Sequence, residues 1–172
     1  MTRPHHPFGG PPRRSARPPA AAPDTAATGG AGFAADAVRL AVLRVPAAEE
    51  HVALVRLCTL HLAGTAGLGA VRVSDLRLAV AEACGTFLEP LEPAPVPGAS
   101  RGDIRVRFDL RRDLLRIQVR GRAPAGWPDH GGLGWLVLRA LVGDLSWERD
   151  GADGVLTLVE HLPAEGFRFA AL

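Results

Sequence analysis

The sequence contains no lysine and no tyrosine, and only two of its 172 residues are cysteines. All 20 basic residues are therefore arginines, which we interpret as the coding bias of a GC-rich genome. Cys58 and Cys84 lie in helical patterns without the spacing of metal ligands, so we expect buried free thiols and no metal site. No apolar run approaches the roughly 18 residues of a membrane span, and no signal-peptide core follows the N-terminal arginines. These absences predict a cytoplasmic protein that does not enter the membrane.

The net charge is small and unevenly distributed. The chain carries a formal charge of +2, but residues 1–33 hold four arginines and one acid, which gives +3. The remaining residues hold 16 arginines against 17 acids, which gives −1. Because a nucleic-acid-binding domain normally has a concentrated basic face, this distribution argues against direct nucleic-acid binding.

Composition divides the chain into three segments. Residues 1–33 hold seven of the 15 prolines and too little apolar surface to offset the chain entropy of folding, so they are predicted to be a disordered tail. Residues 34–163 are predicted to form one folded domain, and residues 164–172 a C-terminal extension. With 47% hydrophobic residues, the chain has enough apolar material for a core.

The apolar patterns predict the order strand, helix, helix, two strands, helix and two strands. A strand over residues 37–45 is followed by a helix that opens at Pro46, and a second helix is capped by Ser74 and ended by Pro90. Two hairpins turn at residues 111–113 and 150–154. This order favours an α+β fold, a two-layer sandwich of a mostly antiparallel sheet with helices on one face.

The same patterns predict which side chains form the core. The second helix buries one stripe, and the first hairpin alternates cleanly between apolar and polar positions; the predicted core residues are Leu76, Val80, Ala83, Phe87, Ile104, Val106, Phe108, Leu115, Ile117 and Val119. In the last hairpin, Leu145 and Trp147 share one face, and Leu156 and Leu158 share another. We expect these four to pack against the helix that contains Leu136 and Leu141.

Three stretches in this order of elements resemble one family: "EEHVALVRL", "LRLAVAEAC" and "GGLGWLVLRALVGDLSWERDGADGVLTLVEHL". They are similar to the anti-sigma-factor serine kinases of the histidine-kinase-like (GHKL) ATPase superfamily, over about residues 37–162. The resemblance implies the fold of that superfamily and an ATP site built from three motifs.

The first motif of that family is a Glu-x-x-x-Asn box on the second helix, where the Glu helps to activate the reacting hydroxyl and the Asn holds Mg²⁺. Glu82 matches the Glu and would be catalytic only in an active enzyme, while Thr86 stands where the Asn belongs. Positions i and i+4 share one helical face, but a hydroxyl is shorter than an amide, which weakens the case for a magnesium site. The alternative for Glu82 is an ordinary helix carboxylate.

The second motif is an Asp-x-Gly-x-Gly loop after the third strand, whose Asp receives the adenine amino group. Gly121 aligns with the Asp and Ala123 with the first glycine. Gly126 is interpreted as a displaced remnant of the motif's glycines. Gly121 has no side chain to accept a hydrogen bond, and an unpaired adenine edge costs about 1–3 kcal/mol.

The third motif is a glycine-rich start of the last helix, at Gly132 and Gly134. Backbone amides at such a helix N-terminus can face a phosphate group. The alternative is that these glycines only form the turn and allow close packing. Taken together, the three motifs indicate a degraded ATP site, so no cofactor is expected, although residual binding of ATP and Mg²⁺ is possible.

Two surfaces are candidates for a protein partner. On the first helix, Arg56 lies beside Leu57 and Leu60, a composition typical of interfaces. On the first hairpin, Arg105 and Arg107 point to the outer side of the sheet, where they form either a docking surface for an acidic partner or a solvated face. For both surfaces an ordinary solvated role stays open.

These observations favour a regulatory domain that sequesters a sigma factor or its antagonist protein. Two alternatives remain. The first is an active ATP-dependent serine kinase of an anti-sigma-factor antagonist. The second is a scaffold that dimerises with an active paralogue; a homodimer is also possible.

Overall fold

A computed structural model describes residues 37–88 and 102–163 of the protein. Its five strands form a single sheet in the order β1-β2-β3-β5-β4, in which every neighbouring pair is antiparallel. The strands are β1 (Val38–Pro46), β2 (Asp103–Arg111), β3 (Leu114–Arg122), β4 (Asp144–Asp150) and β5 (Asp153–His161). The predicted tail and C-terminal extension lie outside the described residues.

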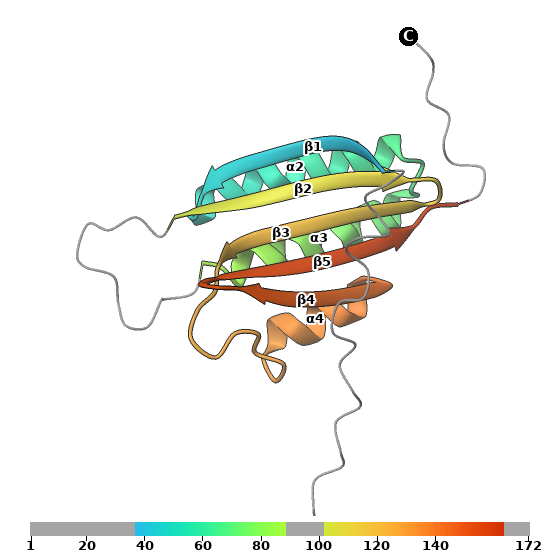
Figure 1. Ribbon diagram of the computed structural model, residues 1–172. Coiled ribbons are helices and arrows are strands. Elements are labelled where there is room, and N and C mark those ends of the chain that lie inside the picture. The colour runs from blue at the N-terminus through green and yellow to red at the C-terminus, as the bar shows by residue number, and fades with distance from the viewer. Residues whose placement is uncertain (1–36, 89–101, 164–172) are drawn as a thin grey trace, which may run out of the picture.

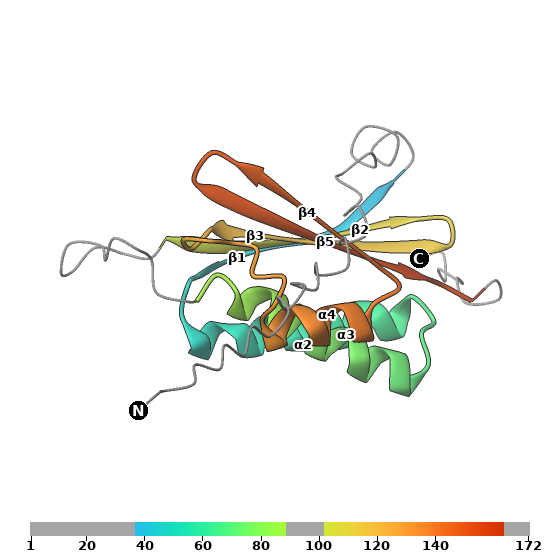
Figure 2. The ribbon, with the colours of Figure 1, turned by 90° about the horizontal axis from the view of Figure 1, so that it is seen from below.

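Three helices cover one face of the sheet and leave the other face open (Figures 1 and 2). They are α2 (Glu49–Thr65), α3 (Ala70–Gly85) and α4 (Leu133–Leu141). The predicted α+β sandwich is therefore confirmed. Within the described residues, no helix is both long enough and apolar enough to cross a membrane.

The core lies between the sheet and the helices, as the alternating patterns predicted. Phe108, Ile117 and Leu158 stand opposite one another on β2, β3 and β5, and all three are fully buried. The ten predicted core residues of α3 and the first hairpin are all buried. Because each strand alternates with period two, burying one set of side chains sends the arginines to the open face.

The structure corrects two predicted helix boundaries. Pro46 does not open a helix but ends β1, because the N–H of the next residue, Ala47, donates to the carbonyl of Gly102 and prolongs the pairing with β2. Ser74 does not cap α3 but lies one turn inside it, because the extended residue Gly69 starts the helix earlier. The helix ends at Gly85, and Pro90 lies outside the described residues.

The last helix faces the core with different residues from those predicted. Leu156 and Leu158 are fully buried and Leu145 and Trp147 are half-buried, but Leu136 is 57% exposed. The helix instead buries Trp135 and Leu138, which are three positions apart and share a face, whereas Leu136 is turned away from it. Leu141 packs partly against the core, as predicted.

An ion pair ties the start of α3 to the end of β5. The Arg72 guanidinium donates to both oxygens of Glu160, with Nε–Oε1 at 3.0 Å and Nη2–Oε2 at 2.6 Å. The Glu160 side chain is only 8% exposed, and this pairing raises the pKa of Arg72. The two-pronged geometry fixes where α3 crosses the sheet.

Candidate functional site

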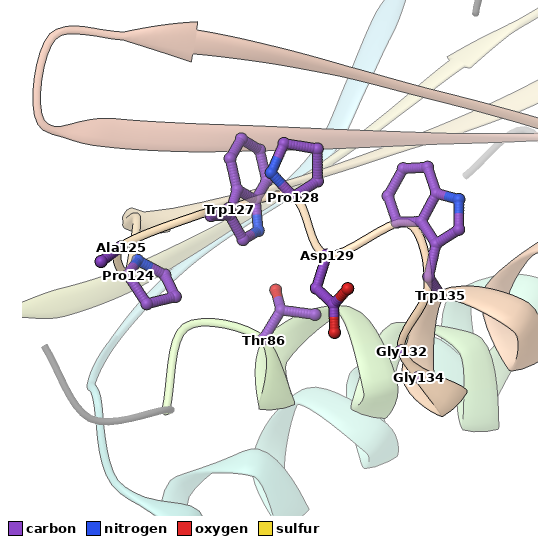
Figure 3. A pocket seen from close by; sticks show the side chains of 9 residues that line it. All are labelled: Thr86, Pro124, Ala125, Trp127, Pro128, Asp129, Gly132, Gly134 and Trp135. Atoms are coloured by element: carbon purple, nitrogen blue, oxygen red, sulfur yellow. The ribbon is translucent and has the colours of Figure 1, made fainter.

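The C-terminal end of α3, the β3–α4 loop and the first turn of α4 surround one small pocket (Figure 3). Its lining residues are Thr86, Pro124, Ala125, Trp127, Pro128, Asp129, Gly132, Gly134 and Trp135. Three of the predicted site residues, Thr86, Gly132 and Gly134, therefore meet here. The pocket measures about 60 Å³, whereas small-molecule sites are typically about 300–1,000 Å³.

Glu82 and Thr86 lie at the α3 side of this site. The Thr86 hydroxyl donates to the carbonyl oxygen of Ala83 at 2.9 Å, so its proton is used within the helix. Glu82 is half-buried and points toward α4: its Oε2 lies 3.7 Å from where a Cβ on Gly134 would stand. The retained carboxylate is therefore next to the first turn of α4.

Gly121 is held in place by an aromatic ring. It is buried in β3, and a Cβ at this position would lie 2.7 Å from Cγ and 2.8 Å from Cβ of Phe87. Phe87 itself is only 3% exposed. The space that an aspartate side chain would need at position 121 is therefore filled by Phe87.

An aromatic cluster continues from Phe87 through the loop to the sheet; it consists of Phe87, Trp127, His130, Trp135 and Trp147. Ring centroids are 5.5 Å apart for Phe87–Trp127, 5.9 Å for Trp127–Trp147, 5.6 Å for His130–Trp147 and 4.6 Å for His130–Trp135. Trp127 also lies against Gly154 of β5, where a Cβ would come within 2.7 Å of its ring. Through these contacts the cluster packs the β3–α4 loop against the sheet.

Ala123 and Gly126, the other two predicted loop residues, do not line the pocket. The Ala123 N–H donates to the carbonyl of Ala152 at 3.0 Å, which continues the sheet beyond β3. Gly126 is exposed and has a φ of +74°, a backbone conformation that favours glycine in a turn. Both residues therefore shape the loop.

Asp129 occupies the N-terminal side of α4. Its Oδ1 accepts from the N–H of Gly131 at 3.1 Å, and its backbone carbonyl accepts from the N–H of Gly132 at 3.2 Å. A carboxylate is favourable beside a helix N-terminus, so this end of α4 already has an anion. Sequence reasoning missed Asp129, Trp127 and the position of Phe87; the run Trp127–Asp129, placed just before the glycines, was the available signal.

Among the described residues, no group of three or more metal-ligating side chains occurs. Cys84 is fully buried, and burial raises the pKa of its thiol to about 12 although the nearby Arg56 opposes this shift. Cys58 is partly buried, and both cysteines are free.

The predicted partner surfaces lie on opposite faces of the domain. On α2, Arg56 is exposed, and Leu57 and Leu60 are 60% and 40% exposed. On the open face of the sheet, Arg105 is exposed and Arg107 is half-buried. The Arg107 Nε forms an ion pair with Asp109 at 2.6 Å.

Residues 45–159 match the family model of the histidine kinase-like ATPase domain. The chain belongs to this family. It is also 30% identical to the serine-protein kinase RsbW of Bacillus cereus (strain AH187) over 77 residues, which are 45% of either chain. To the RsbW of Bacillus mycoides (strain KBAB4) it is 27% identical over 124 residues, which are 72% of this chain and 65% of that protein. It thus spans less than two thirds of the length of these relatives.

The fold of the histidine kinase-like ATPase family is supported by a solved structure. The crystal structure of the RsbU and RsbW domains of a Mycobacterium tuberculosis protein matches with a TM-score of 0.53 and 20% identity, and the match covers 74% of this chain and 35% of that one. The resemblance drawn from the sequence is confirmed at the level of the family by the match over residues 45–159.

The family's nucleotide motifs can now be placed in the structure. Thr86, which the sequence resemblance aligns with the box asparagine, is followed directly by Phe87. The Phe87 ring lies against Gly121, which the same resemblance aligns with the adenine-binding aspartate. The chain contains no asparagine at all. The residues that the resemblance aligns with these two motif positions therefore lie close together in the fold.

Proposed function

We propose that this chain is a cytoplasmic regulatory domain of the anti-sigma-factor kind, which acts on transcription by holding a sigma factor or its antagonist protein and does not act as a kinase. The observation that carries this proposal is the Phe87 ring packed against Gly121. The ring takes the place of the side chain that would select adenine, and its own burial stabilises that arrangement.

Three further features support a site without nucleotide. The pocket of about 60 Å³ is too small for ATP as arranged. The Thr86 hydroxyl is turned to the Ala83 carbonyl, so its proton is used within the helix. Asp129 places a negative charge beside the first turn of α4, which would repel a phosphate group. The residues present therefore fit Mg-ATP poorly.

The proposed role in protein binding is supported by the outer surface of α2. Leu54, Leu57 and Leu60 are 50%, 60% and 40% exposed, and Leu78 of the neighbouring α3 is 49% exposed. Apolar side chains of this size beside an exposed arginine are typical of interface cores. Arg56 could pair with a carboxylate of the partner while its stem packs on these leucines.

One observation favours an active kinase as the second candidate. Glu82, the residue that would activate the hydroxyl, is kept and lies beside Gly134 of α4. The relatives in Bacillus are named as serine-protein kinases. An active enzyme would require the aromatic cluster to open so that a nucleotide could reach Glu82.

Calorimetric titration with ATP, with and without Mg²⁺, separates the two candidates. We expect no saturable binding in the low micromolar range and no phosphate transfer to an antagonist protein. Glu82→Gln is the matched control, because it removes the activating carboxylate and nearly preserves the side-chain volume. Tight Mg-ATP binding, or phosphate transfer that is lost in Glu82→Gln, would establish the kinase instead.

Capture of the partner tests the regulatory half of the proposal. The tagged full chain is used to recover proteins from an extract of its native host, and the mass of each complex is measured in solution. Recovery of a sigma factor or an antagonist supports the proposal. Recovery of a paralogue of this chain alone points to a dimerising scaffold, and recovery of none of these proteins contradicts the proposal.

A further inference from the structure

A polar groove of about 540 Å³ lies at the end of the sheet where β2 begins and β3 ends. This arginine groove is lined by Arg44, Gly102, Asp103, Arg105, Arg120, Gly121, Arg122 and Asp153. It lies in a different place from the pocket at Thr86, and the two share no lining residue. Four arginines against two aspartates give the groove a net positive charge.

The pairing of the strands places like charges side by side in this groove. Arg105 of β2 stands directly opposite Arg44 of β1 on one side and opposite Arg120 of β3 on the other. Like charges directly opposite one another destabilise a sheet. The free domain therefore carries an electrostatic cost along this row of three arginines.

Carboxylates compensate the two outer arginines of the row. Arg44 forms an ion pair with Asp103, and Arg120 forms ion pairs with Asp150 at 2.9 Å and with Asp153 at 3.0 Å. The central residue, Arg105, is exposed and has no such partner among the described residues. The one unneutralised member of the row is thus the one in the middle.

Two arginines near Arg105 differ in whether they have a carboxylate partner. Arg122, which also lines the groove, is exposed and has no ion pair within the described part of the chain. Arg107, two residues along β2 from Arg105, is instead paired at 2.6 Å with Asp109, a carboxylate that is 1% exposed. Within the described residues, Arg105 and Arg122 thus have no carboxylate partner, whereas Arg107 is paired with Asp109 inside the protein.

We propose that the arginine groove binds an acidic segment of a protein partner, whose carboxylates pair with Arg105 and Arg122. This inference rests on the proposed function, which it deepens by giving the partner a second point of contact on the face opposite α2. Arginine forms two-pronged hydrogen bonds with carboxylates. A carboxylate at Arg105 would also relieve the repulsion within the row.

The charge pattern around the groove favours a short acidic segment over a nucleic acid. Asp103 and Asp153 lie within the groove, and β4, at the edge of the same sheet, carries Asp144, Glu148 and Asp150. A nucleic-acid backbone places a phosphate charge about every 1.7 Å along a duplex. Such a backbone crossing the sheet would meet these acids, whereas a short peptide can end inside the groove.

The test uses the full chain and a fluorescein-labelled peptide of eight glutamates, titrated by fluorescence anisotropy. We expect saturable binding that weakens about tenfold in Arg105→Gln, the loss of one charge-assisted pair, and further in Arg105→Gln with Arg122→Gln. Arg77→Gln, an exposed arginine on the helix layer, is the matched control and should leave binding unchanged. Binding should also fall as salt is raised.

Thermal melting of the same variants separates a binding role from a structural one. Arg105→Gln should leave the melting temperature unchanged or raise it, because it removes a repelling charge. Arg107→Gln should lower it, because it removes the nearer partner of the buried Asp109 and leaves Arg39, at 3.7 Å, to compensate the carboxylate. A clearly lowered melting temperature in Arg105→Gln, or peptide binding that this change does not weaken, would overturn the proposal. So would tighter binding of a DNA duplex than of the peptide.

The captured partner distinguishes this inference from the proposed function. If a sigma factor or antagonist binds and the affinity is unchanged in the double arginine variant, the groove is not the contact, and the proposed function stands. If the glutamate peptide binds through Arg105 but no such partner is recovered, the groove stands and the proposed function fails.

Discussion

Replacing Gly121 with alanine tests whether Phe87 fills the space beside Gly121. The added methyl group would lie 2.7 Å from Cγ, 2.8 Å from Cβ and 3.1 Å from Cδ1 of Phe87. These atoms form the root of the aromatic side chain, so the clash cannot be relieved by moving a flexible tip. Either the ring or strand β3 must shift, and both lie in the buried core.

The expected cost follows from overpacking of a filled core, about 1–3 kcal/mol of unfolding free energy. It is measured by chemical denaturation, with the midpoint and slope compared with those of the unchanged protein. Gly85→Ala is the matched control, because a Cβ at this helical position meets nothing within 4 Å. That control should be neutral or stabilising by up to about 1 kcal/mol.

A double-mutant cycle identifies Phe87 as the cause. Phe87→Ala alone should cost about 3–5 kcal/mol. Adding Gly121→Ala to it should cost less than in the unchanged protein, because the contacts with Cγ and Cδ1 are gone and only the contact with Cβ remains. The difference between the two costs of Gly121→Ala is the interaction energy between the residues. If Gly121→Ala behaves like Gly85→Ala, the ring does not occupy this space, and the argument for a filled adenine position is refuted.

Three further predictions concern the rest of the fold and the α2 surface. Leu138→Ala should cost about 2–5 kcal/mol of unfolding free energy, whereas Leu136→Ala, at 57% exposure, should change it by less than about 0.5 kcal/mol; equal costs would reverse the facing of α4. Arg72→Ala should cost about 1–3 kcal/mol, less than for a fully buried pair because Arg72 is 41% exposed; an unchanged denaturation midpoint would show that the pair with Glu160 does not hold α3. Arg56→Ala should leave stability within about 0.5 kcal/mol and weaken binding of a captured partner by about 2 kcal/mol or more; unchanged affinity would move the interface away from α2.

The fold could be predicted from the sequence because its strands are strongly patterned. The strict alternation around Phe108 and Ile117 fixed both the pairing of β2 with β3 and the face that meets the helices. Helix starts were less predictable. Ser74 has the side chain of a good cap, yet the N-cap of α3 is Gly69, whose backbone is extended and which makes no side-chain capping bond.

The candidate site could be predicted only in part. The resemblance predicted that Thr86 and Gly121 differ from the family motifs, because that comparison needs only the identity of each residue. It did not show that Phe87 lies against Gly121, since that contact joins the turn after α3 to β3 across 34 positions of the chain. Nor did it show which arginines of the open face are neutralised, because ion pairs such as Arg120–Asp153 depend on strand register.

The aromatic cluster leads to a final prediction about control by nucleotide. Because the pocket beside this loop is only about 60 Å³, a nucleotide could enter only if the β3–α4 loop moved. Here Trp127 of that loop packs on Phe87 and on Gly154 of β5, and the residue is 8% exposed. Moving the loop would expose this ring, and burial of an aromatic side chain is worth about 1.5–3 kcal/mol.

A nucleotide that makes few compensating contacts cannot supply that energy. A ligand shifts a conformational equilibrium only by its differential affinity for the two states. Partner affinity should therefore be the same with and without millimolar Mg-ATP, measured by titrating the captured partner. Trp127→Ala, which frees the loop, is the informative variant: partner binding that becomes ATP-dependent there would show that the cluster suppresses the nucleotide response. ATP dependence in the unchanged protein would contradict the closed site and favour the kinase.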